Sequence, residues 1–206
     1  MTTPLYVTDL YADNPLLSYA SFDGFDLATE SYAGLDHGIR AVLSLDLLPG
    51  APLPYVYQVI DSPFDDSFNT LDAPNAWVTL TGGNDGVTLG SGSALVTQAA
   101  GVGNDAYLFH AGALPGDMLS FKHADNPVSP GHHDFIWFLG FGAGAQLEAV
   151  AGFQPHGYAA TTQAPGLAWQ GYQVVSAEGH VLLGAFGVAF AGAPGQALGA
   201  GDYAFG

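Results

Sequence analysis

Residues 76–110 read AWVTLTGGNDGVTLGSGSALVTQAAGVGNDAYLFH and alternate short apolar runs with clusters of turn-forming residues. Runs of this length, rich in Val, Thr, Leu and aromatic residues, are typical of β-strands. The clusters between them, GGNDG at 82–86 and GVGND at 101–105, contain the residues that form tight turns. The stretch therefore predicts short strands joined by turns. The predicted strands are Ala76–Leu80, Gly86–Leu89, Ala94–Gln98 and Ala106–His110.

The same alternation continues on both sides of this stretch. Further strands are predicted at Tyr55–Ile60, Asp117–Lys122, Asp134–Gly140, Ala168–Val175 and His180–Phe190. The continuous apolar run Phe135–Leu139 predicts a central strand, since its length and aromatic content favour a strand over a buried helix. Many short strands with regular turn signals predict an all-β protein, an antiparallel β-sandwich of the jelly-roll type.

The first part of the chain differs from the rest. Residues 1–54 are acidic and aromatic, and they end in LPGAPLP at 48–54, where two prolines favour extended backbone. We expect a less regular N-terminal attachment or assembly segment over residues 1–54 and a β-sandwich domain over residues 55–206.

The charge balance excludes several classes of partner. The chain has 2 basic residues, Arg40 and Lys122, against 19 acidic ones, and its formal net charge is −17. Such a chain cannot neutralise a run of phosphates or dock on an anionic membrane, so nucleic acid is not an expected partner. Nucleotide-binding glycine motifs are missing too. The expected ligand is neutral or cationic, a metal, or another protein.

Targeting signals are not readable in the sequence. The first twenty residues contain two aspartates and no positively charged region, so no classical signal peptide is predicted. The longest apolar stretch near the C-terminus, Val181–Ala193, is interrupted by glycine and too short to span a bilayer, so no membrane insertion is expected.

One part of the chain resembles a known family. The segment DSPFDDSFNTLDAPNAW at 61–77, followed by GVTLGSGSALVTQ at 86–98, is similar to the opening of concanavalin A-like jelly-roll domains of the lectin and laminarinase type. From Gln98 to Gly140 the likeness lies in strand spacing alone. The resemblance implies glycan binding on a sheet face or in edge loops, with calcium in some members and glycoside hydrolysis in others.

Hydrolysis of the laminarinase type is not expected here. Those enzymes place two glutamates close together on one strand, because an acid and a nucleophile must flank one glycosidic bond. The three glutamates of this chain, Glu30, Glu148 and Glu178, lie far apart in the sequence. Binding without catalysis is the better interpretation.

Aromatic and polar residues gather in a stretch flanked by glycine and proline. A ring can stack on the apolar face of a sugar while imidazole and amide groups bond its hydroxyls. The alternative is that core packing accounts for the rings. The predicted glycan contacts are His156, Tyr158, Trp169, Gln170 and Tyr172.

Two further clusters are candidate metal sites. Asp61, Asp65 and Asp66 offer the hard oxygen ligands that calcium prefers, although the order of an EF-hand is missing and turn formation also explains them. His123, His132 and His133, near Asp125 and Asp134, offer ligands for a transition metal. Their spacing matches no established zinc motif, and such a polar loop is usually solvated or holds a histidine paired with a carboxylate. Calcium is the candidate cofactor.

Together these observations favour a non-catalytic β-sandwich protein displayed on an extracellular particle or virion, such as a phage fibre or a capsid decoration. It would bind a neutral glycan or mediate assembly, as a homo-oligomer or as part of a larger complex. Two alternatives stay open. One is a glycan-active enzyme or metal-binding protein secreted without a leader, and the other is a structural subunit of an oligomer.

Overall fold

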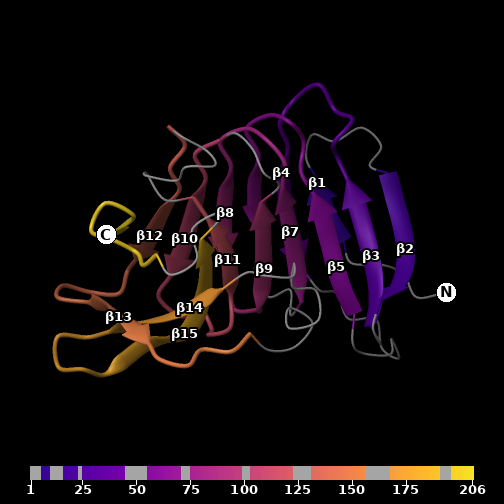
Figure 1. Cartoon of the computed structure of the whole chain (residues 1–206). Coiled ribbons are helices and arrows are strands. Elements are labelled where there is room, and N and C mark those ends of the chain that lie inside the picture. The colour runs from indigo at the N-terminus through magenta and orange to yellow at the C-terminus, as the bar shows by residue number, and fades with distance from the viewer. Residues whose placement is uncertain are drawn as a thin grey trace.

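The computed structural model describes residues 6–9, 16–22, 25–44, 55–70, 75–98, 103–122, 131–155, 168–190 and 196–206. The all-β prediction is confirmed, because these residues form sixteen strands and no helix (Figure 1). Sheet A has seven strands, in the order β1 (Tyr6–Asp9), β4 (Arg40–Ser44), β6 (Ser67–Asn69), β8 (Gly86–Leu89), β10 (Ala106–His110), β12 (Phe135–Leu139) and β16 (Tyr203–Phe205). Sheet B has nine, in the order β13 (Gln146–Val150), β14 (Trp169–Val175), β15 (Val181–Phe190), β11 (Met118–Phe121), β9 (Ala94–Gln98), β7 (Ala76–Leu80), β5 (Tyr55–Ile60), β3 (Phe25–Ser31) and β2 (Leu16–Phe22).

The prediction of an antiparallel jelly roll is wrong. From β4 to β16, every pair of neighbouring strands in sheet A is parallel. In sheet B, the neighbouring strands β3, β5, β7, β9, β11 and β15 are also parallel to one another. From β3 to β12, consecutive strands alternate between the two sheets, so each turn of the chain adds one strand to both. The chain forms a two-sheeted parallel β-coil, in which no helix is needed to connect parallel strands.

Antiparallel strands occupy the beginning and the end of this coil. β1 pairs with β4, and β2 pairs with β3. Near the C-terminus β13, β14 and β15 form an antiparallel extension of sheet B. The strands on either side of residue 54, where we expected a boundary, belong to the same two sheets, because β3 pairs with β5 and β4 with β6.

A row of aspartates sets the register of the coil. Asp85 Oδ1 accepts a hydrogen bond of 2.8 Å from the Asp66 backbone N–H, 19 residues earlier. Asp105 Oδ1 accepts one of 3.1 Å from Asp85 N–H across 20 residues, and Asp134 Oδ1 one of 3.0 Å from Asp105 N–H across 29. We call Asp66, Asp85, Asp105 and Asp134 the inner ladder. Each member starts a strand of sheet A, and each carboxylate satisfies a buried backbone donor of the preceding turn.

A second row lies beside the first on the exposed side. Asn84 N–H donates to Asp65 Oδ1 at 2.8 Å, and Asn104 N–H donates to Asn84 Oδ1 at 3.0 Å. His133 N–H donates to Asn104 Oδ1 at 2.8 Å. The two rows together explain why an Asn-Asp pair recurs before β8 and β10, with His-Asp in the same place before β12.

A glycine, Gly83 or Gly103, directly precedes each Asn-Asp pair, at the point where the backbone passes close to the previous turn of the coil. Gly83 has φ 93° and Gly103 has φ 130°, values that side chains other than glycine rarely adopt. A Cβ atom would also collide with the Phe64 carbonyl oxygen at Gly83 and with the Gly83 carbonyl oxygen at Gly103. The turn therefore requires glycine at both positions.

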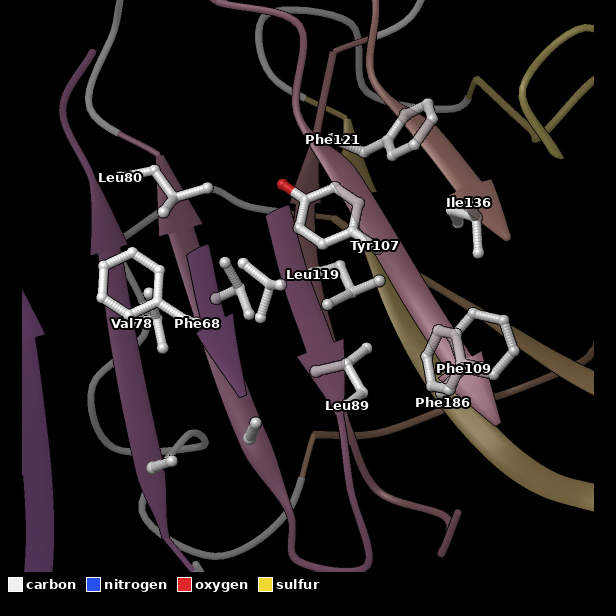
Figure 2. Close-up of a cluster of buried hydrophobic side chains, with 14 of the residues drawn as sticks. Phe68, Val78, Leu80, Leu89, Tyr107, Phe109, Leu119, Phe121, Ile136 and Phe186 are labelled. Atoms are coloured by element: carbon white, nitrogen blue, oxygen red, sulfur yellow. The ribbon is translucent and has the colours of Figure 1, made fainter. Parts of the chain in front are cut away.

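The core lies between the two sheets and is rich in aromatic rings. Figure 2 shows Tyr107 and Phe109 of β10 beside Phe186 of β15 and Leu119 of β11. The ring centroids of Phe109 and Phe186 are 4.8 Å apart, and those of Phe109 and Phe138 are 5.4 Å apart. Since alternate residues of each strand point into this layer, the others form the outer faces.

Candidate functional site

The outer face of sheet A carries an exposed group of apolar and aromatic side chains. On β12, Ile136 and Phe138 are fully buried, whereas Trp137 between them is 41% exposed. Phe135 and Leu139 are half-buried on the same side as Trp137, and β10 adds half-buried Leu108 and exposed His110. We call Phe135, Trp137, Leu139, Leu108 and His110 the aromatic face.

The strand register determines how these side chains meet. Phe135 lies opposite Ala106 of β10, and Trp137 lies between Leu108 of β10 and Ala204 of β16. Small alanine neighbours leave room beside the rings. The ring centroids of Phe135 and Trp137 are 5.0 Å apart with an interplanar angle of 53°.

A histidine extends the row of rings by one position. The His133 ring stands edge-on to Phe135, with a centroid distance of 6.5 Å and an angle of 81°. Its Nε2 lies 3.0 Å from Asp202 Oδ1, a buried carboxylate that fixes the imidazole. Rings at alternate positions of one strand can stack on successive apolar surfaces of an extended ligand, while imidazole bonds its hydroxyls.

The prediction of a central strand at Phe135–Leu139 is confirmed, but it did not reveal this face, because a continuous apolar run does not show which side chains point outward. β12 is an inner strand of sheet A, between β10 and β16, but only one of its faces contacts the core. Its outward residues are as apolar as its inward ones, so the sequence shows no alternation of apolar and polar residues from which the exposed side could be predicted.

The predicted glycan contacts are not brought together on one exposed surface. His156 and Tyr158 lie outside the described residues. Trp169 is half-buried and packs with Trp77 and Phe153 against Leu95 and Met118.

Tyr172 is only 3% exposed and belongs to the core. Its hydroxyl oxygen accepts a hydrogen bond of 2.9 Å from Leu198 N–H. Gln170, the remaining predicted contact, is half-buried on β14. Core packing therefore accounts for Tyr172, which has no free ring face for a sugar.

Of the predicted calcium ligands, the structure brings Asp61 and Asp66 together and adds Asp85. Asp65 is exposed, and its Oδ1 accepts the bond from Asn84 that begins the second row. From the sequence, the loop that contains Asn84 and Asp85 could add oxygens to this site only if it folded nearby, and the structure places Asp85 there. The signal that could have identified it is the second Asn-Asp pair twenty residues later, which marks Asp85 as a repeated position.

The predicted transition-metal ligands have other partners. His123 lies outside the described residues. His132 Nδ1 accepts a hydrogen bond of 3.1 Å from Gly103 N–H, and His133 is held by Asp202. Within the described ranges, the grouped side chains that could hold a metal ion are Asp61, Asp66 and Asp85.

Comparison with protein-family models, with curated proteins and with solved structures gave no match. Nothing in these comparisons bears on the resemblance to concanavalin A-like domains. In the part of the chain that the structure describes, no helix has the length and apolar character needed to cross a membrane.

Proposed function

We propose that this protein is a non-catalytic binding module that takes a neutral glycan on the aromatic face of sheet A. The observation that carries the proposal is Trp137, a large ring that is 41% exposed on β12, an inner strand with a parallel neighbour on each side. Phe135 and His133 continue the row of rings on the same strand and the turn before it. Exposed aromatic side chains in a row are a usual device for holding sugars.

The charge of the chain supports a neutral ligand. With a formal net charge of −17, the protein repels anionic polysaccharides at low salt. The aromatic face itself carries no carboxylate, lysine or arginine among its five members. Recognition there depends on stacking and on the histidine nitrogens rather than on ion pairs.

The direct test is retention of the protein by neutral polysaccharides in affinity electrophoresis, followed by isothermal titration with the fragments that bind. We expect Trp137→Ala to weaken binding at least tenfold, because one stacking contact contributes on the order of 1 kcal/mol or more beyond its buried area. Trp169→Ala is the matched control, since Trp169 is a half-buried tryptophan of sheet B.

The variants separate the two possible locations of a sugar site. Loss of binding in Trp137→Ala with retention in Trp169→Ala supports the aromatic face. The reverse pattern moves the site to the residues predicted from sequence. Circular dichroism and the melting temperature of each variant show whether it is folded.

A second candidate is a subunit of a larger assembly, favoured by the apolar character of the same face. Trp137 and Leu108 form an exposed apolar surface of the kind that marks protein interfaces. Light scattering after size exclusion separates this role from the first. A defined oligomer that Trp137→Ala dissociates, with no glycan retained, identifies the face as an interface between copies.

A further inference from the structure

Three carboxylates meet inside the coil at the corner between β5 and β6. Asp61 follows β5, Asp66 precedes β6 and Asp85 precedes β8. Their side chains are 0%, 4% and 2% exposed, so all three are buried. One oxygen of each lies within 4.8 Å of one oxygen of both others. We call these residues the acidic corner.

Hydrogen bonds hold two of these groups in place. The Asp61 carboxylate accepts from Thr81 N–H at 2.9 and 2.8 Å, and also from the Thr81 hydroxyl. Asp66 accepts from Ile39 N–H at 2.6 Å, from Ser62 N–H at 2.8 Å and from the Ser62 hydroxyl. These donors orient the oxygens but are neutral, so they leave the negative charge of both groups uncompensated.

Asp85 adds an oxygen without a partner. Its Oδ1 accepts from Asp66 N–H, whereas its Oδ2 is buried with no hydrogen-bond partner. A buried carboxylate oxygen without a donor is costly. This oxygen is a ligand position that no described protein donor fills.

At the other end of the inner ladder, buried carboxylates are paired with a positively charged side chain. There the Lys122 ammonium lies 3.0 Å from Asp105 Oδ2 and 3.5 Å from Asp134 Oδ1. No described ion pair joins a basic side chain to Asp61, Asp66 or Asp85. The acidic corner therefore groups three carboxylates, against two around Lys122, and no ion pair with a basic side chain is described for it.

We propose that the acidic corner binds one calcium ion through Asp61, Asp66 and the free oxygen of Asp85. Calcium takes oxygen ligands at about 2.3–2.6 Å, so oxygens on opposite sides of one ion lie about 4.6–5.2 Å apart. The three carboxylates, with one oxygen of each within 4.8 Å of the others, are grouped on the scale of such an ion.

An open surface depression reaches the acidic corner from outside. Its lining includes Gly38, the exposed Arg40, Asp65 and Asp66. Asp66 thus belongs both to the depression and to the buried cluster, and an ion can enter by this route. Magnesium is the less suitable occupant, because it gives up its own water reluctantly.

The test uses the full chain after removal of divalent ions with a chelating resin, at pH 7.5 in 0.1 M KCl. Calcium chloride is titrated calorimetrically, with magnesium chloride as a parallel arm. We expect one calcium per chain, with weaker binding of magnesium. We also expect a higher melting temperature with calcium than with EGTA at matched ionic strength, because an ion bound only by the folded state stabilises it.

Asp85→Asn is the decisive variant, because an amide oxygen can still accept from Asp66 N–H while the second oxygen is lost. We expect at least a tenfold loss of calcium affinity. Asp117→Asn is the matched control, since Asp117 Oδ1 accepts from Ala94 N–H at 2.7 Å and its Oδ2 is also buried without a partner. Asp117 lies outside the acidic corner, so this variant should bind calcium like the parent.

A parent protein that gives neither heat nor a shift in melting temperature overturns the proposal. So does an Asp85→Asn variant that binds as tightly as the parent. The occupant is then a proton shared between Asp61 and Asp85, since one oxygen of each lies within 4.8 Å of the other. If Asp85→Asn does not fold, Asp61→Asn provides the same comparison with its Thr81 contacts kept by the amide oxygen.

Discussion

Replacement of Lys122 by methionine tests whether the buried cation supports the coil. Lys122 is 4% exposed, and its ammonium is the single charged donor described for the Asp105 and Asp134 pair. In Lys122→Met both carboxylates keep neutral donors, chiefly the Gln98 amide at 2.7 Å from each. Removing one partner of a buried ion pair costs about 3–5 kcal/mol, because the other charge stays buried and unpaired.

The loss is large against the total stability of a domain, which is about 5–15 kcal/mol. With a denaturant slope of about 2 kcal/mol per molar urea, the unfolding midpoint falls by about 1.5–2.5 M. The assay is urea unfolding at pH 7.5, followed by tryptophan fluorescence and circular dichroism. Arg40→Met is the matched control, because Arg40 is the other basic residue of the chain and is exposed on β4. The Arg40→Met substitution should change the free energy of unfolding by no more than about 0.5 kcal/mol.

The pH dependence gives an independent check. Burial, followed by the nearby Asp105 charge, raises the pKa of Asp134 to about 6, and Lys122 opposes this increase. Without the lysine the pKa of Asp134 rises further, so this carboxyl takes up a proton at pH 5 and one of the two unpaired charges disappears. The difference in the free energy of unfolding between the parent and Lys122→Met should therefore be smaller at pH 5 than at pH 7.5. A deficit below 1 kcal/mol at pH 7.5, or one that grows at pH 5, would refute this reasoning.

Two further predictions concern the buried carboxyl of Asp117 and a glycine of the coil. Burial raises the pKa of Asp117 well above its usual range, so its contribution to stability is complete below the unfolded pKa and is lost as pH rises. Between pH 4 and pH 8 the free energy of unfolding should fall less steeply for Asp117→Asn than for the parent, by at most about 1.4 kcal/mol per pH unit. Equal dependence of the free energy of unfolding on pH in the variant and the parent would contradict this prediction. Gly103→Ala should lower the free energy of unfolding by more than about 3 kcal/mol, because it adds a collision with the Gly83 carbonyl to the cost of a positive φ. Gly112→Ala, where φ is 98° but the space around the Cβ position is open, should cost about 1 kcal/mol, and similar melting temperatures for the two variants would exclude the collision.

The sequence predicted the strands far better than their arrangement. Tyr55–Ile60, Ala76–Leu80, Gly86–Leu89, Ala94–Gln98 and Ala106–His110 are strands with the predicted bounds. Glycine and aspartate between them indicate where the backbone turns but not whether it returns beside the same strand or crosses to another sheet. The hairpin interpretation led to the antiparallel sandwich.

The information that distinguishes the two arrangements is the position of the Asn-Asp pairs. Asn84-Asp85 and Asn104-Asp105 stand at the same place in successive turns, but the next turn is 29 residues long and hides the period. For the same reason Asp85 was not counted with Asp61 and Asp66. The exposed ring of Trp137 could not be predicted, because its apolar neighbours Ile136 and Phe138 have the same character and opposite orientations.

The direction of the inner ladder has a consequence for how the chain acquires its structure during synthesis. The backbone N–H groups of Asp66, Asp85 and Asp105 are each satisfied by a carboxylate that emerges later from the ribosome, that of Asp85, Asp105 and Asp134 respectively. A nascent chain that ends at one turn therefore leaves its last turn with an unsatisfied donor until the next turn arrives. We therefore expect ordering to proceed from the N-terminus with a lag of one turn, and we expect a coil cut between two turns to be less stable than its length alone would suggest.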